Sequence, residues 1–286
     1  MWLNGKNMHK NSLANLPPIL RYSSAYSDFS IERVTRAEVE AGKAPRILYK
    51  FRGPDEFTKK LIQNSAIYHS SPLNFNDPFD CQLTIDTTNT FAELVDFIVR
   101  NNPKFKLKEA RARAKSWQEH PVEFRQFMNE AARSIFSRHG VACYALNPDS
   151  LLMWSHYANS HRGVCLRFDV LEDISPFSPL FPVRYEETYP VLNNIRNNNG
   201  AVVTRLLTTK GRQWEYEEEW RVVKMAETGN HGFAPRALKE IIFGVNAQPK
   251  FIDDIVTLVK ANNKYEVMLT KAYVSKTQFK LNFRAL

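Results

Sequence analysis

The sequence predicts an α+β fold, and two features of the chain support that prediction. Short apolar runs with the character of strands alternate with helical patterns, but the alternation is uneven, which favours α+β over a doubly wound parallel sheet. The helical patterns gather in one long stretch, residues 90–139, which we expect to form an insertion. With 286 residues, 43% of them hydrophobic and 12% aromatic, the chain can bury one large core or two modest ones, and its composition excludes a disordered protein.

The main domain is expected to open with a strand, a helix and a second strand. Residues 46–52 and 66–71 are apolar runs with strand character, and residues 55–64 carry apolar side chains at helical spacing. Residues 1–45 lie before this pattern and contain a Leu-Pro-Pro sequence that cannot propagate a helix. We therefore expect an N-terminal appendage at 1–45 and a single domain at 46–286.

The insertion should contain three helices. Thr90 and Glu93 have the spacing of a capping box, in which each side chain satisfies a backbone N–H group at the start of a helix. Two further helical patterns cover residues 107–117 and 122–138, and Gly140 ends the last of them. The remaining elements are shorter, with strands expected at 141–146, 163–168, 183–185, 219–224, 240–243, 266–274 and 279–283 and helices at 148–157 and 251–261.

The chain carries excess positive charge, with a net charge of +9 and a pI of about 9.4. Such an excess favours an anionic partner, either nucleic acid or a phosphate-bearing ligand. Part of the excess lies in the insertion, where a single acid, Glu109, accompanies Arg100, Lys104, Lys106, Lys108, Arg111, Arg113 and Lys115. This basic face either is a solvated surface or contacts nucleic acid.

The composition disfavours several kinds of site. Cys81, Cys143 and Cys165 are widely spaced and form no Cys-x-x-Cys pair, which predicts small buried thiols rather than nucleophiles. The chain has no His-Glu-x-x-His pattern, no Gly-x-Ser-x-Gly pattern and no glycine-rich phosphate loop, so we expect no metal. No apolar run approaches the length of a membrane span and no signal segment opens the chain, so we expect a cytoplasmic protein without membrane contact.

The Asn-Asp-Pro sequence at residues 76–78 has two interpretations. Asn76 and Asp77 either bond their own backbone in a tight turn or line a cleft and offer amide and carboxylate groups to a ligand. From the second interpretation follows a hydrolase hypothesis, in which Asp77 or Asp80 acts with His156. That hypothesis requires those side chains to lie close together.

Trp154 and Tyr157 are three positions apart on a predicted helix and therefore share one face. That face either packs in the core or forms an aromatic wall on which a flat ring stacks. In the second case His156 lies near the edge of the wall.

Residues 214–221 hold a dense cluster of four carboxylates, three aromatic side chains and one arginine. In a strand, Glu217 and Glu219 point to one face, and Arg221 returns to that face, where it can neutralise a carboxylate. The cluster is either a device that keeps an edge strand soluble or a catalytic carboxylate held by a second one. A carboxylate pair of this kind can bond a ribose hydroxyl and stabilise an oxocarbenium-like centre.

The order of these motifs resembles a widespread bacterial family catalogued only as a domain of unknown function. The resemblance covers roughly residues 46–274 and is carried by residues 48–52, 70–80, 153–157, 161–164, 214–221 and 242–244. It implies no activity by itself.

The same order is also similar, more distantly, to the ADP-ribosyltransferase superfamily, which includes toxins that modify DNA. That resemblance implies two small mixed or antiparallel sheets that form a cleft for NAD. It implies an NAD-dependent ADP-ribosyltransferase or NAD-glycohydrolase, such as a toxin or phage-defence effector, with Glu219 catalytic at the nicotinamide ribose and Glu217 orienting the acceptor. The positions that fit its substrate-binding residues are Arg52 or Lys50 on the first strand and Ser70 and Ser71 on the second. With the residues that the motifs themselves offer to a ligand, they make up the expected substrate-binding set: Tyr49, Lys50, Arg52, Ser70, Ser71, Asn76, Asp77, Trp154, His156, Tyr157 and Arg221.

Two classes of function therefore stay open. An NAD-using enzyme requires Arg52, Ser70 and Glu219 to line one pocket with the aromatic helix. A non-catalytic module would instead bind nucleic acid or a nucleotide through the basic face of the insertion, in a salt-sensitive manner. The sequence leaves the oligomeric state open.

Overall fold

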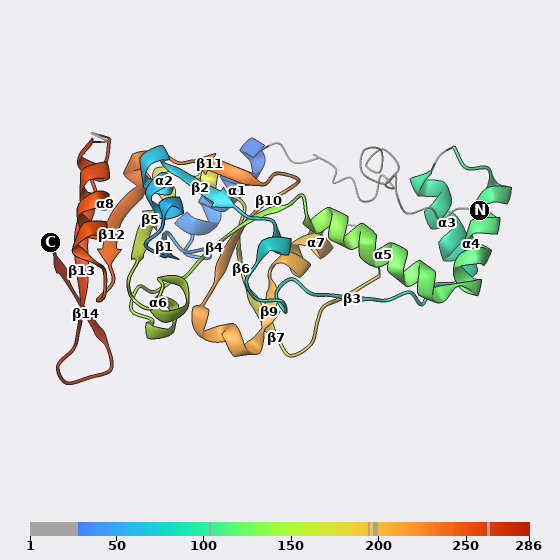
Figure 1. Ribbon diagram of the computed structural model, residues 1–286. Helices are drawn as coiled ribbons and strands as arrows, with labels where there is room; N and C mark the ends of the chain where they lie inside the picture. The colour runs from blue at the N-terminus through green and yellow to red at the C-terminus, as the bar shows by residue number, and fades with distance from the viewer. Residues whose placement is uncertain (1–27, 103, 194, 197–199, 262–263) are drawn as a thin grey trace.

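Helices and open sheets follow one another along an elongated molecule, with the helical insertion at one end and the C-terminal strands at the other (Figure 1). The α+β prediction is confirmed, because the strands form several small open sheets and most of the long helices are segregated in the insertion. Residues 1–27 of the expected appendage lie outside the described residues. The structure, a computed structural model, describes residues 28–102, 104–193, 195–196, 200–261 and 264–286.

The largest sheet has five strands in the order β1-β5-β12-β13-β14. Neighbouring strands are antiparallel except β12 and β13, which are parallel. A parallel pair needs a crossover connection, and helix α8 supplies it. The elements are β1 (Ile47–Arg52), β5 (Val164–Asp169), β12 (Leu238–Phe243), α8 (Pro249–Ala261), β13 (Met268–Val274) and β14 (Leu281–Ala285).

A second sheet of three strands, in the order β4-β10-β6, adjoins the edge of the first. Its antiparallel strands are β4 (Gly140–Tyr144), β10 (Trp220–Lys224) and β6 (Leu180–Pro182). Tyr49 and Ala145 exchange two backbone hydrogen bonds, of 2.9 and 2.8 Å, and thereby join β1 to the end of β4.

Three short strand pairs complete the sheets. The antiparallel pair of β2 (Ala66–His69) and β11 (Gly229–Gly232) joins β4 through a bridge between Ser70 and Val141. The two parallel pairs are β3 (Thr84–Ile85) with β8 (Val191–Leu192), and β7 (Arg184–Glu186) with β9 (Thr209–Gly211). A 3-10 helix, η5 (Arg212–Glu217), follows β9 directly.

The insertion contains the three helices that the sequence predicts, α3 (Phe91–Asn101), α4 (Leu107–Glu119) and α5 (Pro121–Phe136). The capping box is present, because the Glu93 amide donates to Thr90 Oγ1 at 3.2 Å and the Thr90 amide donates to a Glu93 carboxylate oxygen at 2.8 Å. Trp117 stacks on Phe124 with 4.7 Å between ring centroids and gives the insertion an aromatic centre of its own. Among the helices in the described ranges, none combines the length and hydropathy that a bilayer crossing requires.

Strand β5 is buried on both faces because it lies between two apolar clusters. Leu166 and Phe168 face the cluster formed with α2 (Glu56–Asn64) and α8. Cys165 points to the other face and packs with Trp154 of α6 (Leu151–Tyr157). Successive strand residues point to opposite faces, so a strand covered on both sides shows no alternation of polar and apolar residues.

The described part of the expected appendage packs on the domain. Helix α1 (Asp28–Glu40) and the turn after it bury Val39 and Ala44 in the main apolar cluster. Thr35 Oγ1 lies 3.0 Å from Ser178 Oγ, so the helix is also held by a buried hydrogen bond. Residues 28–45 therefore contribute to the core, a contact that the prediction of an appendage did not include.

Two glycines allow close backbone contacts around the end of α6. A Cβ atom at Gly163 would overlap the carbonyl oxygen of Arg52, and one at Gly244 would overlap the carbonyl oxygen of His161. The loop after α6 therefore lies directly against the ends of β1 and β12.

We predict that His69 makes stability depend on pH below neutrality. Its ring is fully buried, its centroid lies 4.3 Å from that of His231, and burial, His231 and Lys50 together lower its pKa from 6.5 to about 3. The unfolded chain binds this proton below about pH 6.5 and the folded chain does not, so the stabilisation is complete above pH 6.5 and is lost as the pH falls toward 3.

Urea unfolding should therefore show a loss of about 2 kcal/mol between pH 7 and pH 5, and His69→Leu should reduce that slope. Equal slopes in the variant and the wild-type protein would contradict the assignment.

Candidate functional site

Five charged side chains converge in the interior beside the second sheet. Asp80, Lys210, Glu217, Glu219 and Arg221 are each at most 7% exposed. Burying an ionised group costs several kcal/mol unless it is paired and hydrogen-bonded, so their contacts decide what the cluster can do.

Arg221, on β10, binds two carboxylates through two neighbouring edges of its guanidinium group. Its Nη1 and Nη2 atoms donate to the two carboxylate oxygens of Asp80 at 3.0 and 2.6 Å. Its Nε and Nη2 atoms donate to the two oxygens of Glu219 at 2.8 and 3.1 Å. Both contacts have the bidentate geometry that suits a guanidinium group, and a fifth bond, from Nη1 to the Leu207 carbonyl at 2.9 Å, completes its coordination.

Lys210, on β9, lies between the carboxylate of Glu219 and a third carboxylate, that of Glu217. Its Nζ atom donates to Glu219 at 3.1 Å and to Glu217 at 2.5 Å. The other oxygen of Glu217 accepts from the Tyr157 hydroxyl at 2.7 Å. The result is a chain of alternating charges that ends at a tyrosine hydroxyl. We call the six residues of this chain the charge relay: Asp80, Arg221, Glu219, Lys210, Glu217 and Tyr157.

The relay depends on a turn that the sequence pattern did not indicate. Glu217 and Glu219 were expected to share one face of a strand, but Glu217 ends η5 and β10 begins at Trp220. Glu218 between them has a φ angle of +45°, in the left-handed region. Its exposed carboxylate accepts from Asn147, while its neighbours both turn inward to Lys210. The shared direction was therefore predicted, although its cause is a left-handed residue and not strand alternation.

Opposite charges determine the protonation of the relay. Burial by itself would raise the pKa of Glu219, but Arg221 and Lys210 oppose that shift and hold the pKa well below its usual range. Burial lowers the pKa of Lys210, but the negative charges of Glu219 and Glu217 more than offset that effect. The net pKa is raised, so the ammonium group stays charged. Burial and the negative charge of Glu219 raise the pKa of Glu217, and Lys210 and Tyr157 offset that shift only in part, which makes Glu217 the more easily protonated of the two glutamates.

An aromatic surface lies next to the Glu217 end of the relay. The rings of His156 and Trp214 are 6.1 Å apart, and those of Trp214 and Tyr216 are 6.0 Å apart. Lys210 Nζ lies 4.9 Å from the centre of the Trp214 ring. His156, Tyr157, Trp214 and Tyr216 thus form a half-exposed group of rings, brought together by α6 and η5.

Other predicted site residues have structural contacts. Trp154 is fully buried and its indole N–H donates to the Pro148 carbonyl at 2.6 Å, so it is a core residue and not an exposed wall. Tyr49 is held in the sheet by its bridge to Ala145. Lys50 Nζ donates to the Cys143 carbonyl at 3.0 Å, and burial lowers its pKa to about 8.

The two serines and Arg52 lie around the ends of β2 and β1. Ser70 pairs with Val141, and Ser71 accepts the Leu73 amide at the start of a short 3-10 turn. Arg52 Nε is buried without a hydrogen bond among the described residues. Within the described ranges, none of these three side chains forms a hydrogen bond or an ion pair with a relay residue.

The Asn-Asp-Pro sequence forms a turn. Asp77 accepts the Phe79 amide at 2.9 Å, and Asn76 is exposed. Asp80 is engaged by Arg221, while His156 lies beside Trp214. The hydrolase hypothesis, which needs Asp77 or Asp80 beside His156, gains no support from these contacts.

Sequence reasoning missed Lys210. It lies in Thr-Lys-Gly at residues 209–211, without a motif, and only the fold reveals that it is 6% exposed between two glutamates. The sequence also did not mark Tyr185 as a site residue, although its hydroxyl accepts the backbone amide of Glu219 at 2.8 Å.

The basic face of the insertion is exposed as expected. Arg100 pairs with Asp96, Lys115 pairs with Glu119, and the Arg113 guanidinium lies over the Trp117 ring. Within the described ranges, no ion pair involves the other four cations, Lys104, Lys106, Lys108 and Arg111.

A comparison with known protein families finds a match that covers most of the relay residues. Residues 153–222 match the family model described as Protein of unknown function (DUF2971). The expected resemblance to a domain-of-unknown-function family is confirmed. The DUF2971 segment contains Tyr157, Lys210, Glu217, Glu219 and Arg221, so five of the six relay residues lie within it and Asp80 lies before it. Searches of the curated proteins and of the solved structures found no match.

We predict that Glu219→Gln destabilises the protein by about 3–5 kcal/mol, because it removes a buried carboxylate from between two buried cations. Urea unfolding measures the change. The neighbouring exposed Glu215, changed to Gln, should alter stability by no more than about 0.5 kcal/mol. A Glu219→Gln protein as stable as the Glu215→Gln protein would show that the relay contributes little to the fold.

Proposed function

We propose that this protein binds nucleic acid through the basic face of its helical insertion. The observation that carries the proposal is the set of four exposed cations, Lys104, Lys106, Lys108 and Arg111, with no acidic partner among the described residues. An array of unneutralised cations attracts a polyanion and releases its counterions on binding.

The geometry of the insertion supports contact with an extended partner. α4 lies at the end of the molecule, away from the two large sheets (Figure 1). Lys108, Arg111 and Lys115 recur at helical spacing on α4, which gives a basic strip along one side of the helix. Phe105 is 42% exposed among the lysines that precede α4, and an exposed ring within a basic strip suits stacking on an unpaired base.

We predict that reversing the four unpaired cations (Lys104→Glu, Lys106→Glu, Lys108→Glu and Arg111→Glu together) weakens binding of a single-stranded oligonucleotide at least a hundredfold at low salt. Fluorescence anisotropy over a salt series is the measurement. Each lost phosphate contact should reduce the slope of log K against log salt by about 0.7 for single strands.

A matched control reverses four exposed lysines elsewhere: Lys43, Lys60, Lys250 and Lys260. It makes the same change in net charge, so a loss limited to the insertion variant separates a local contact from general attraction. Equal losses in both variants, or tight binding that survives the first set, would contradict the proposal.

We propose NAD consumption as a second candidate function, favoured by one observation. Glu217 carries the more easily protonated carboxylate of the relay, is hydrogen-bonded by Tyr157, and lies beside the rings of His156, Trp214 and Tyr216. Both oxygens of Glu219 accept from the cations Arg221 and Lys210, whereas one oxygen of Glu217 accepts only from the neutral hydroxyl of Tyr157, next to the aromatic surface, so we prefer Glu217 over Glu219 as the acting carboxylate.

In this second candidate the nicotinamide ring stacks on the aromatic surface. The bond between the nicotinamide nitrogen and ribose C1′ breaks, nicotinamide leaves with the bonding electron pair, and a carboxylate stabilises the positive ribose. Water or an acceptor nucleophile then bonds to C1′, and its proton passes to bulk water.

We predict that Tyr157→Phe lowers release of nicotinamide from NAD at least tenfold while the protein stays folded, because only the hydrogen bond to Glu217 is lost. Chromatography of nicotinamide with a panel of acceptors is the measurement, and Tyr68→Phe, at an exposed tyrosine, is the control. A wild-type protein that releases no nicotinamide excludes this candidate and leaves nucleic-acid binding unaffected.

A further inference from the structure

The five-stranded sheet ends in an edge strand with one open side. β14 pairs with β13, and no strand among the described residues pairs with its other side. Figure 1 shows β13 and β14 at the end of the molecule opposite the insertion, joined by a turn that extends beyond the sheet. An open edge presents unpaired backbone N–H and C=O groups, to which another strand can add.

Two hydrogen bonds show which backbone groups of β14 are free. The Ser275 amide donates to the Lys280 carbonyl at 3.0 Å, and the Leu286 amide donates to the Leu269 carbonyl at 2.9 Å. Lys280 and Leu286, just before and just after β14, therefore both face β13. Bonded and non-bonded residues alternate in an antiparallel pair, so every second residue between them directs its N–H and C=O groups to the open side. These residues are Leu281, Phe283 and Ala285.

The hairpin of β13 and β14 has one basic face and one apolar face. Side chains of paired residues lie on the same face, and successive residues alternate between faces. The face on the side of α8 carries Lys271 and Arg284, which are paired in register, and Lys280 continues the same row. The opposite face carries Leu281 and Phe283, which pack with the apolar cluster that includes α6. A strand added to β14 would therefore meet cations on one face and apolar side chains on the other.

The positive charge of the hairpin is not neutralised within the fold. Residues 268–286 contain no aspartate or glutamate, and they contain four cations: Lys271, Lys276, Lys280 and Arg284. Within the described ranges none of these cations forms an ion pair, and Arg284 lies over the Tyr273 ring at 5.3 Å. Like charges on an edge strand oppose pairing with a second copy of the same edge, so the strand that suits this edge carries the opposite charge.

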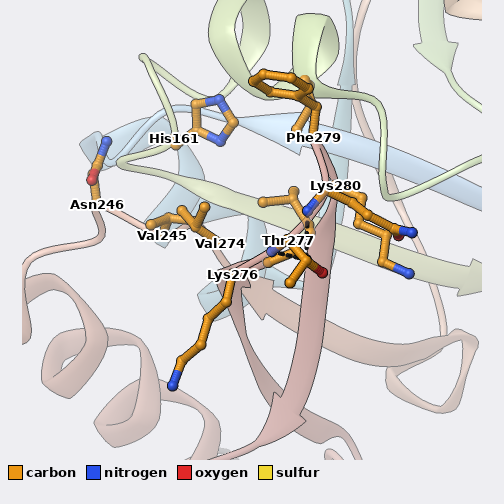
Figure 2. Close-up of a pocket in the computed structure, with 12 residues that line it drawn as sticks. His161, Val245, Asn246, Val274, Lys276, Thr277, Phe279 and Lys280 are labelled. Carbon is orange, nitrogen blue, oxygen red and sulfur yellow. Dashed lines mark hydrogen bonds between the residues drawn. The ribbon is translucent and has the colours of Figure 1, made fainter.

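The apolar face of the hairpin is only partly covered. Val274, which is paired with Leu281, is 67% exposed, and Phe279 in the turn is fully exposed. A pocket of about 500 Å³ opens at this end of the face, and its lining includes Val245, Val274 and Leu281 (Figure 2). Apolar surface left open beside a free strand edge is typical of a site where a partner adds its own strand.

We propose that β14 binds an extended segment of a partner protein in which acidic and apolar residues alternate. The segment adds a sixth strand to the sheet, and its backbone bonds the free groups of the three outward-facing residues. Its carboxylates lie beside Lys280 and Arg284, and its apolar side chains continue the face of Leu281 and Phe283. In this mode of recognition main-chain hydrogen bonds supply affinity and alternate side chains supply specificity.

Fluorescence anisotropy of the full chain with labelled eight-residue peptides tests the proposal. A peptide of alternating glutamate and valine should bind. A peptide of alternating lysine and valine, and one with the glutamates and valines in two separate blocks, should each bind at least tenfold more weakly. No binding of the first peptide at millimolar concentration would overturn the proposal. Equal binding of the alternating and block peptides would also overturn it, because it would reduce the contact to charge alone.

Amide hydrogen exchange, followed by NMR, separates strand addition from charge attraction. The amides of Leu281, Phe283 and Ala285 should exchange more slowly in the complex with the alternating glutamate peptide. The amides of Asn282 and Arg284, which face β13, should change less. Unchanged exchange at all three outward-facing amides would overturn the proposal.

Two hairpin variants test the assigned contacts. Lys280→Glu with Arg284→Glu should weaken the alternating glutamate peptide at least tenfold, while Lys43→Glu with Lys60→Glu, an equal charge change at exposed positions elsewhere, should leave it unchanged. Ala285→Pro removes an outward N–H group and should also weaken the peptide, since an edge strand tolerates proline on its open side. Unchanged affinity in both hairpin variants would overturn the proposal.

The insertion provides the remaining controls. The variant with four reversed charges in the insertion should bind the peptide normally, because the two surfaces lie at opposite ends of the molecule (Figure 1). Failure of this proposal and failure of the nucleic-acid proposal can therefore be recognised separately. Displacement of the peptide by the single-stranded oligonucleotide would assign the hairpin to nucleic acid and overturn the proposal.

Discussion

The rest of the structure depends on the two bidentate ion pairs that Arg221 forms with Asp80 and Glu219. A guanidinium with no exposed surface is costly unless every donor is satisfied, and here two carboxylates and a backbone carbonyl satisfy them. Because the carboxylates come from the loop before β3 and from the start of β10, the guanidinium cannot form its contacts until those segments are together. The ion pair thus couples the entrance to the insertion with the second sheet.

Lys210 extends this coupling to helix α6. Through Glu217 it reaches Tyr157 at the end of α6, and α6 is anchored in turn by Trp154, which has no exposed surface. Loop, β9, β10, η5 and α6 are therefore joined by one line of alternating charges.

The two large sheets separate two ends of different chemical character (Figure 1). The insertion has its own aromatic packing around Trp117 and presents cations outward, which suits a long anionic partner. The end of the five-stranded sheet presents a pocket of about 500 Å³ whose lining includes two lysines and an exposed phenylalanine.

Local sequence determined much of the secondary structure. The capping box at Thr90 and Glu93 marked the start of α3, a basic helical pattern marked α4, apolar spacing marked α5, and short apolar runs marked β1, β4, β5 and β13, because each of these signals acts over a few residues. The sequence also marked Glu217, Glu219 and Arg221 as residues that belong together. Only the tertiary structure decided that they are buried, that Lys210 lies between the two glutamates and that Trp154 is a core residue. Those outcomes depend on which distant segments meet, and a lone lysine or a tryptophan on a helix has the same local pattern whether it faces water, a ligand or the interior.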